Sequence, residues 1–498
     1  YFIKMFKRFL KVINNDVFFF SLLFLLILFL FKNAFSIQFF RDDFFFLKIS
    51  DARSFTDFIN FFSPIRTYSY KPLATEVFYF FLISIGKNIF IGHLLVFTVY
   101  FIGLYYLKKT IMLLTNNNLF SKLTVFFYAI SFIHVFQLFL FATFQEVMLF
   151  TCIILSFYYY QKNLILLNLL FFLGALLSKE TAILFIVFLT SFEFIYKKNT
   201  FIKKFPLLIT NIILAAIFLL VYKYSLSHVT LLDNYKLHFN NPKLIINNSM
   251  WYFLWSLGFP NFMSDVFRNF PFQPLPDFWK AFATPEFKEY FYSLIIYYLI
   301  FFIFLTIYIA KNIVKTIEIL KTSFYALISF FIFLGPILLF SHKWMDRLTL
   351  PLIFVVLLKA YFVFLFISSK EKLFKIIAFI IIFLFIFWNF FGIKVHESSS
   401  GYNLLNRISK NASIYFKRNK KEILKHRYLF LYDPIDKGKL VKPWGGSEKL
   451  TNVLWGQYFV SYYFPDSNIT VLYNFENKTI PLDSFIATSS AIILLNNN

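Results

Sequence analysis

The stretch "LILLNLLFFLGALLSKETAILFIVFLTSFEFIY", residues 164–196, contains two apolar runs separated only by Lys179 and Glu180. A helix of about 20 apolar residues crosses a hydrocarbon core about 30 Å thick, because an α-helix rises about 1.5 Å per residue. Each run here is somewhat shorter, which favours tilted helices or a locally thinned bilayer. The stretch therefore predicts two membrane helices joined by a charged hairpin.

Similar apolar runs recur along most of the chain. Of its 498 residues, 59% are hydrophobic and 80 are phenylalanine. A soluble fold has too little interior to bury that fraction, whereas lipid accommodates it. The sequence therefore predicts an α-helical polytopic membrane protein with about eleven transmembrane helices. The expected spans are roughly 12–31, 89–107, 123–141, 146–160, 164–178, 180–196, 205–224, 291–310, 322–341, 348–368 and 375–393.

The formal net charge of +24 is explained by loops on the cytoplasmic side, and not by nucleic acid as a partner. With the N-terminus in the cytoplasm, the eleven spans alternate with the basic loops. The cytoplasmic loops then hold Lys108, Lys109, Lys122, Lys162, Lys197, Lys198, Lys203, Lys204, Lys311, Lys315, Lys321, Lys370, Lys372 and Lys375. No small-residue cleavage site follows the first run, which predicts a retained helix in the cytoplasmic (inner) membrane.

Residues 72–87, "PLATEVFYFFLISIGK", interrupt this alternation. A crossing here would reverse every later loop and place the lysine-rich loops outside. We therefore expect an interfacial or re-entrant helix on the outer face, with Pro72 in its first turn. A true span with the opposite N-terminal orientation is the alternative.

Three regions are expected outside the membrane: residues 33–88, residues 225–290 and the tail. The predicted boundary separates a transmembrane domain, residues 1–395, from an extracytoplasmic domain, residues 396–498. Short runs in the tail ("YLFLYD", "YFVSYYF", "ITVLYNF", "AIILL") predict strands in a small mixed α/β domain. We expect this domain not to carry the chemistry. Residues 225–290 are expected either to cap the site or to be an inert loop.

The stretch "FFRDDFFFL", residues 39–47, places Asp42 and Asp43 just after the first span. Carboxylates at a membrane interface need no special function, and Arg41 can pair with one of them. The long first outer loop that follows is rich in further acids, which favours a functional role. Acids at the outer interface of a hydrophobic bundle lie where a lipid headgroup and a soluble acceptor can meet.

Five motifs, "RDDFFFL", "YKPLATEVFYFFLISIGKNIFIGHLL", "FQEVMLF", "LLSKETAILFIVF" and "DRLTLPLIF", occur in an order that resembles the GT-C membrane glycosyltransferases. The bacterial relatives of protein O-mannosyltransferases and of the lipid A aminoarabinose transferase are the most similar, over residues 10–395. The resemblance implies a GT-C-like bundle, a sugar donor on polyprenyl phosphate and transfer at the outer face. It makes Asp42 the catalytic base, with Asp43 beside it, and Glu146 the second acidic position.

The residues fit this chemistry independently. Transfer from a lipid-linked sugar needs a base that takes the acceptor's proton, which Asp42 supplies. It also needs cations for the departing phosphate, which Lys71, Lys179 and Arg347 supply. Many relatives have arginine where this chain has Lys71, and lysine offers only a point charge.

Some of these positions have simpler explanations. Lys179 and Glu180 can lie in a tight outer hairpin whose charges reach water, although charges inside an apolar stretch more often mark function. Arg347 begins a span and can extend its charge to the interface.

A metal site has little support. Glu76 with Asp42 and a histidine offers a possible divalent cation site, but no ligand spacing supports it. The single cysteine, Cys152, excludes an intramolecular disulfide. No phosphate-binding loop for a nucleotide is present.

The sequence thus predicts an inverting glycosyltransferase that uses a polyprenyl-phosphate sugar donor and a glycan, lipid or protein acceptor. An O-antigen-type polymerase or ligase is the rival enzyme, and would depend more on outer-loop arginines. A transporter or lipid flippase is the rival from another class, and would show pseudo-symmetric halves with broken helices at matching positions.

Overall fold

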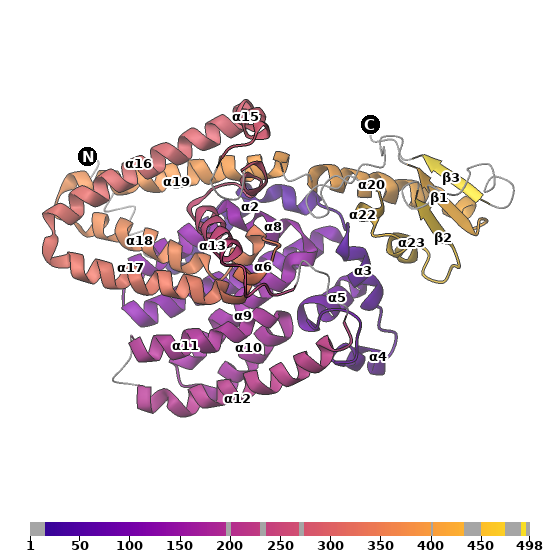
Figure 1. The fold of residues 1–498 in the computed structure, drawn as a ribbon, viewed down its shortest axis with the longest axis horizontal. Coiled ribbons are helices and arrows are strands. Elements are labelled where there is room, and N and C mark those ends of the chain that lie inside the picture. Colours follow the sequence, from indigo (N-terminus) through magenta and orange to yellow (C-terminus); the bar gives the residue numbers. More distant parts are fainter. Residues whose placement is uncertain are drawn as a thin grey trace.

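The computed structural model describes residues 15–195, 201–229, 236–267, 273–399, 402–432, 450–473 and 490–494. Long helices run side by side in a bundle, and a small unit that contains the strands projects from one end of it (Figure 1). Short helices α3, α4 and α5 lie at the same end of the bundle as this unit.

The first half of the chain, in which η marks a short 3-10 or π element, forms α2 (Asp16–Leu30), η1 (Lys32–Ser36), α3 (Asp42–Ile49), α4 (Phe55–Asn60), η2 (Leu73–Val77), α5 (Phe78–Ser84), α6 (Ile89–Thr115), α7 (Asn118–Ala129), η3 (Phe132–His134), α8 (Val135–Phe139), η4 (Phe141–Thr143), α9 (Phe144–Gln161), α10 (Ile165–Ser178), η5 (Glu180–Ile183), α11 (Leu184–Ile195) and α12 (Phe201–Leu226). The second half forms α13 (Pro242–Leu257), α14 (Met263–Val266), α15 (Pro276–Phe282), α16 (Pro285–Lys311), α17 (Ile313–Leu334), η8 (Gly335–Leu339), η9 (Met345–Leu348), α18 (Leu352–Ser368) and α19 (Lys372–Ser399). The C-terminal unit forms α20 (Tyr402–Arg418), α21 (Lys420–Ile423), β1 (Tyr428–Tyr432), α22 (Leu450–Leu454), α23 (Tyr458–Tyr463), β2 (Thr470–Tyr473) and β3 (Ser490–Leu494).

Six helices in the described residues are long and apolar enough to cross a membrane, or seven if a pair bent by 48° counts as one span. The six are Ile89–Thr115, Phe141–Gln161, Ile202–Leu226, Pro285–Lys311, Ile317–Leu339 and Lys372–Ser398. The protein is therefore an α-helical multi-pass membrane protein. The expected spans lie on helices of the described residues, except that the span at 123–141 falls on two helices, Asn118–Ala129 and Phe132–Phe139, bent by 48°. Because α2, α10, α11 and α18 are short, eleven crossings stay a prediction.

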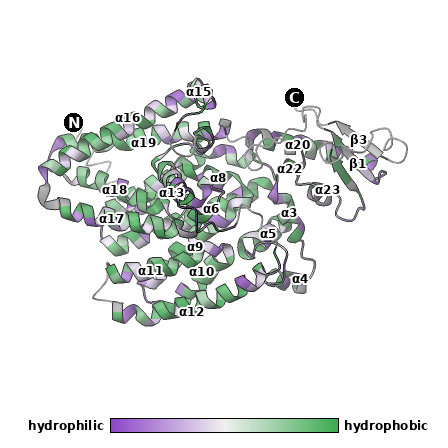
Figure 2. Cartoon of the chain, in the orientation of Figure 1, coloured by the Kyte–Doolittle hydropathy of each residue, from purple (hydrophilic) through white to green (hydrophobic). Residues whose placement is uncertain are grey.

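The bundle helices are mainly hydrophobic along their length (Figure 2). Large side chains on α12 and α16 remain exposed at helical spacing, and include Ile209, Ile213, Ile217, Leu220, Ile296, Leu299, Phe302 and Ile303. Exposed apolar faces of this extent on a soluble protein would drive aggregation, whereas in a bilayer they contact lipid tails.

The residues expected as an interfacial helix form η2 and α5. Before them, the Lys71 ammonium lies 3.5 Å from the Glu180 carboxylate. After them, the Lys87 ammonium lies 4.3 Å from the centre of the Tyr462 ring in α23. Lys71 also acts electrostatically on Asp42 in α3. Both ends of this helix therefore lie at the end of the bundle that carries the C-terminal unit, as expected for a helix that does not cross.

Loops that were expected on one side of the membrane contact one another. Lys311, after α16, pairs with Glu371, before α19, at 2.8 Å. Lys108 in α6 and Lys122 in α7 each lie 2.7 Å from the Asp16 carboxylate at the start of α2. The arrangement agrees with the predicted alternation of loops, while which end faces the cytoplasm remains a prediction.

The C-terminal unit contains a parallel sheet in the order β2-β1-β3. Three of the four predicted strand runs form strands. The fourth, "YFVSYYF", is wrong as a strand and forms α23, because Phe459 and Tyr463, one helical turn apart, both pack on Phe416. Parallel neighbours need a crossover between them, and α22 and α23 lie in the connection from β1 to β2.

Candidate functional site

The short helix α3 begins at the two adjacent aspartates. Arg41, just before it, has a φ of 57°, which residues other than glycine adopt only when their surroundings impose it. The Arg41 N–H donates a 2.8 Å hydrogen bond to the carbonyl oxygen of Val453 in α22. The C-terminal unit therefore holds the backbone turn that presents Asp42 and Asp43.

Asp43 is buried, and its carboxylate is occupied. The Phe40 N–H donates to Oδ2 at 2.9 Å, and the hydroxyl of Tyr79 in α5 donates to Oδ1. Burial raises the pKa of Asp43 to about 7, and the neighbouring Asp42 acts in the same direction. Asp43 thus joins α3 to α5 and is not free to receive an acceptor.

Asp42 is half-buried and keeps a free carboxylate. It makes no hydrogen bond or ion pair with any other residue that the structure describes. Burial raises the pKa of Asp42 above its usual range, and Arg41 and Lys71 offset part of this effect. A carboxylate with a raised pKa is a stronger base than an ordinary exposed aspartate. Of the two aspartates, Asp42 is the one able to accept a proton from a bound molecule.

Lys71 connects the first loop to the hairpin between α10 and α11. Its ammonium lies 3.5 Å from the Glu180 carboxylate and also acts on Asp42. Glu180 is partly exposed, whereas the neighbouring Lys179 is buried. The hairpin charges therefore do not simply reach water.

Lys179 forms a buried ion pair with Glu146, in the first turn of α9. Beside this pair lies a polar cavity of about 10 Å³, which is room for about one water molecule. Its polar lining comes from Glu146, Lys179, Thr181 and Arg347. Charged side chains from α9 (Glu146), from the hairpin (Lys179) and from the segment before α18 (Arg347) therefore meet around this cavity.

Arg347 is half-buried in the short 3-10 helix η9. Its Nη1 donates to the carbonyl oxygen of His342 at 3.3 Å, and its guanidinium lies 5.4 Å from the centre of the Phe340 ring. Electrostatic interactions join Arg347 to Glu146 and to Glu180. The guanidinium is therefore held by its own loop beside the cavity.

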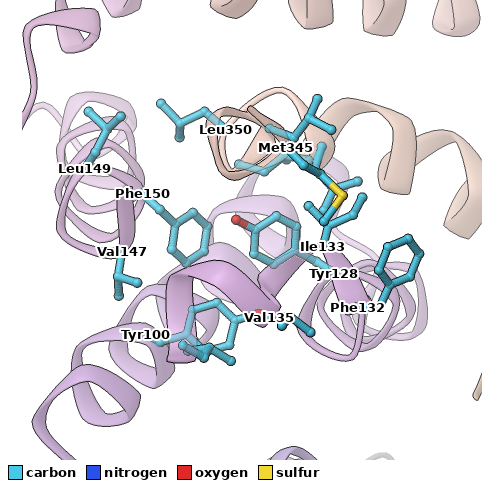
Figure 3. Close-up of a cluster of buried hydrophobic side chains, with 14 of the residues drawn as sticks. Tyr100, Tyr128, Phe132, Ile133, Val135, Val147, Leu149, Phe150, Met345 and Leu350 are labelled. Atoms are coloured by element: carbon cyan, nitrogen blue, oxygen red, sulfur yellow. The ribbon is translucent and has the colours of Figure 1, made fainter. Parts of the chain in front are cut away.

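An aromatic core fixes the backbone around Arg347. The ring of Tyr128 stacks on Phe150, with centroids 4.9 Å apart, in the buried cluster that also contains Met345 and Leu350 (Figure 3). The Tyr128 hydroxyl donates to the Thr349 carbonyl oxygen at 2.7 Å. Large buried rings leave little room for movement, so this segment is held rigidly.

Helix α13 holds the same segment from the other side. The Asn248 amide donates to the carbonyl oxygens of Leu338 and Phe340, at 3.0 and 2.8 Å. The Tyr252 hydroxyl accepts a hydrogen bond from the Trp344 N–H at 3.2 Å. Part of the loop expected as a cap or inert connector therefore supports the residues around Arg347.

An apolar cavity of about 200 Å³ adjoins the polar one, and the two share Phe333 and Leu350 as lining residues. Its other walls come mainly from α6, α9, α11, α17 and α18, and include Leu107, Ile111, Ile154, Phe157, Phe188, Phe354 and Leu357. The charged residues around the small polar cavity therefore lie next to an apolar chamber of the kind that can hold part of a hydrocarbon tail.

Glu76 lies away from this network. Its carboxylate is fully buried, pairs with the Arg66 guanidinium and accepts from the Thr75 hydroxyl. The Arg66 guanidinium also lies against the rings of Tyr68 and Tyr70, at 5.1 and 4.8 Å from their centres. These contacts occupy Glu76, so it has no oxygen available for a substrate.

The residues proposed for a divalent cation do not converge. Within the described parts of the chain, no group of three histidine, cysteine, aspartate or glutamate side chains lies close enough to hold a metal ion. Asp42 has Lys71 as its electrostatic neighbour, and Glu76 has Arg66.

The structure thus brings six of the eight expected residues into one charged network: Asp42, Lys71, Glu146, Lys179, Glu180 and Arg347. Asp43 is buried beside Asp42 and hydrogen-bonded to Tyr79, and Glu76 is buried in a separate pair with Arg66. Sequence reasoning missed Arg66, whose buried pair with Glu76 depends on packing that the local sequence does not encode. It also missed Tyr79 and Tyr252, for which the sequence offers no signal.

No protein-family model, curated protein or solved structure matches this chain. The functional assignment therefore rests on the residues and on their geometry.

Proposed function

We propose that this protein is an inverting glycosyltransferase that moves a sugar from a polyprenyl-phosphate donor to an acceptor on the outer face of the membrane. The observation that carries the proposal is the free carboxylate of Asp42 beside Lys71, in one charged network with Arg347. This network meets an apolar chamber that is large enough for part of a hydrocarbon tail.

In the proposed reaction, an acceptor hydroxyl oxygen attacks the anomeric carbon of the sugar. The new C–O bond forms as the bond from the anomeric carbon to the phosphate oxygen breaks, which inverts the configuration. Asp42 takes the hydroxyl proton, and polyprenyl phosphate leaves with the electron pair. Arg347, Lys179 and Lys71 stabilise the negative charge that develops on the phosphate.

Asp42→Asn tests the base. The amide keeps the shape of the side chain and removes its basicity, so transfer should fall by roughly 10²–10⁴-fold. The measurement is release of polyprenyl phosphate from a radiolabelled polyprenyl-phosphate hexose, in proteoliposomes of the purified protein. Asp277→Asn, at an exposed pair with Lys280, is the matched control and should keep wild-type rates. Near wild-type transfer by Asp42→Asn would exclude the proposed base.

Arg347→Ala tests stabilisation of the leaving group in the same assay. Loss of one preorganised cation should lower turnover by about a hundredfold or more, and Arg347→Lys should recover only part of it. If Arg347→Ala turns over at the wild-type rate, the guanidinium only reaches the interface and takes no part in the reaction.

A further inference from the structure

The C-terminal unit has a cleft of about 560 Å³ that the proposed reaction does not use. One wall is the segment from Lys420 to Arg427, which leads into β1, and the other is the segment from Tyr463 to Ile469, which leads into β2. Because β1 and β2 are parallel neighbours, both segments meet at the edge where the strands begin. The volume lies within the range of pockets that hold small molecules.

The cleft carries an excess of positive charge. Lys425 pairs with Glu422 at 2.7 Å, and Asp466 lies 3.6 Å from Arg53 of the first loop. Lys420 and Arg427 line the same cleft and have no acidic partner among the described residues. Two uncompensated cations in a concave surface favour a carboxylate or phosphate group, which arginine can bind with two parallel hydrogen bonds.

Other residues of the cleft fit a sugar. The Asn468 amide is exposed and has no partner among the described residues, so it can both donate to and accept from hydroxyl groups. The Tyr463 ring packs on Phe416 and Phe459, and these contacts hold its orientation as it lines the cleft. A rigid aromatic surface with a few polar groups is the usual lining of a small-molecule site.

We propose that this cleft binds an anionic saccharide, a sugar that carries a phosphate or carboxylate group. As a place for the acceptor, this rests on the proposed glycosyltransferase function. The Arg53–Asp466 pair places the rim of the cleft beside the loop that follows α3, the helix that begins at Asp42.

Binding to the full-length protein in nanodiscs of neutral lipid tests the proposal without any transfer reaction. Glucose 6-phosphate is the probe, and glucose and inorganic phosphate are the comparisons, measured by calorimetric titration. Glucose 6-phosphate should bind at least about tenfold more tightly than either, because each comparison lacks half of the recognised groups. Equal binding of phosphate would show an anion site without sugar recognition, and equal binding of glucose would exclude the role of the cations.

Variants locate the binding. Lys420→Gln/Arg427→Gln should weaken glucose 6-phosphate binding by about tenfold or more, whereas Lys410→Gln/Lys288→Gln, at exposed positions outside the cleft, should leave it unchanged. Asn468 is exposed, so its replacement should not disturb packing. Asn468→Ala should lower the affinity for glucose 6-phosphate until it approaches the affinity for inorganic phosphate. Full binding by both cleft variants would overturn the proposal.

Two further binding measurements distinguish a saccharide from a lipid headgroup in the cleft, and distinguish this proposal from the proposed role of Asp42. If anionic phospholipid in the nanodisc abolishes binding of the probe to the wild-type protein, the cleft holds a lipid headgroup and not a saccharide. Asp42→Asn should bind glucose 6-phosphate as the wild type does. A failure of the cleft and a failure of the catalytic base therefore give different results.

Discussion

Asp42 and Asp43 are neighbours in the chain but have opposite surroundings. Successive residues of a helix point about 100° apart, so the two carboxylates cannot share one direction. Asp43 turns into the protein toward Tyr79, and Asp42 remains free beside Lys71. The Asp43 carboxylate thus holds α3 in place, while the Asp42 carboxylate is available for the proposed proton transfer.

The titration of Asp43 predicts how stability depends on pH. Burial raises its pKa in the folded protein to about 7, above about 3.9 in an unfolded chain, so the folded state binds the proton more tightly. This contribution to stability is complete below about pH 4 and is lost as the pH rises to about 7. Asp43→Asn should flatten the fall of the thermal unfolding midpoint across this window.

The control for this prediction is Asp277→Asn, at an exposed pair with Lys280, which should keep the wild-type pH profile. An Asp43→Asn protein with an unchanged profile would show that another group causes the fall.

At the scale of elements, α13 ends inside the bundle and meets a buried lysine. The Lys359 ammonium, in α18, lies 3.3 Å from the Ser256 carbonyl oxygen in the last turn of α13. It also lies 5.4 Å from the centre of the Trp388 ring and 5.6 Å from that of Tyr298. A cation is favoured at a helix C-terminus, where carbonyl groups lack partners. Lys359 therefore orients the helix that holds the segment around Arg347.

Lys359→Met separates this orienting role from stability. Burying a cation without an acidic partner costs more free energy of desolvation than contacts with one carbonyl group and several aromatic rings recover. Replacing such a cation by a hydrophobic residue is often neutral or stabilising. We expect the thermal unfolding midpoint not to fall, while transfer falls several-fold because α13 loses its anchor. A lower midpoint with unchanged transfer would show that Lys359 serves only the fold.

The positions of the long helices could be predicted from sequence because the length and composition of an apolar run decide them. The prediction of "YFVSYYF" as a strand was wrong, since six apolar or aromatic residues with one serine fit a strand and a helix equally until packing on Phe416 selects one face. The network from Asp42 to Arg347 was predicted through motifs. The Asp43–Tyr79 bond and the Lys359 contact depend on long-range packing that no local pattern encodes.

At the scale of the whole molecule, the loops are sorted between two ends of the bundle, which predicts the pattern of chemical labelling. In a Cys152→Ser background, Thr56→Cys and Glu286→Cys should react with an impermeant thiol reagent added outside cells. Thr115→Cys and Lys370→Cys should react only after permeabilisation; all four positions are exposed. Outside labelling of Thr115→Cys with protection of Thr56→Cys would reverse the predicted orientation.

The C-terminal unit braces α3, although it supplies none of the proposed catalytic groups. Phe459 of α23 packs edge-on against Phe44 of α3, with ring centroids 5.0 Å apart. Phe459→Ala removes a buried ring, a change that costs about 3–5 kcal/mol, and should loosen α3. Transfer should fall at least tenfold while donor binding, which depends on the bundle, is retained. Tyr415→Ala, at an exposed ring on α20, is the control.

The hydrogen bond from Arg41 to Val453 has a consequence for biosynthesis. More than four hundred residues of chain separate the two, so a ribosome that adds about 5–20 residues per second needs roughly 20–80 s to pass from one to the other. Throughout that interval the strained turn at Arg41 has no partner, and Asp42 is not yet set in its place. A nascent chain that has not reached Val453 lacks the hydrogen bond that holds the turn before Asp42, so we expect the proposed activity only after the C-terminal unit has been made.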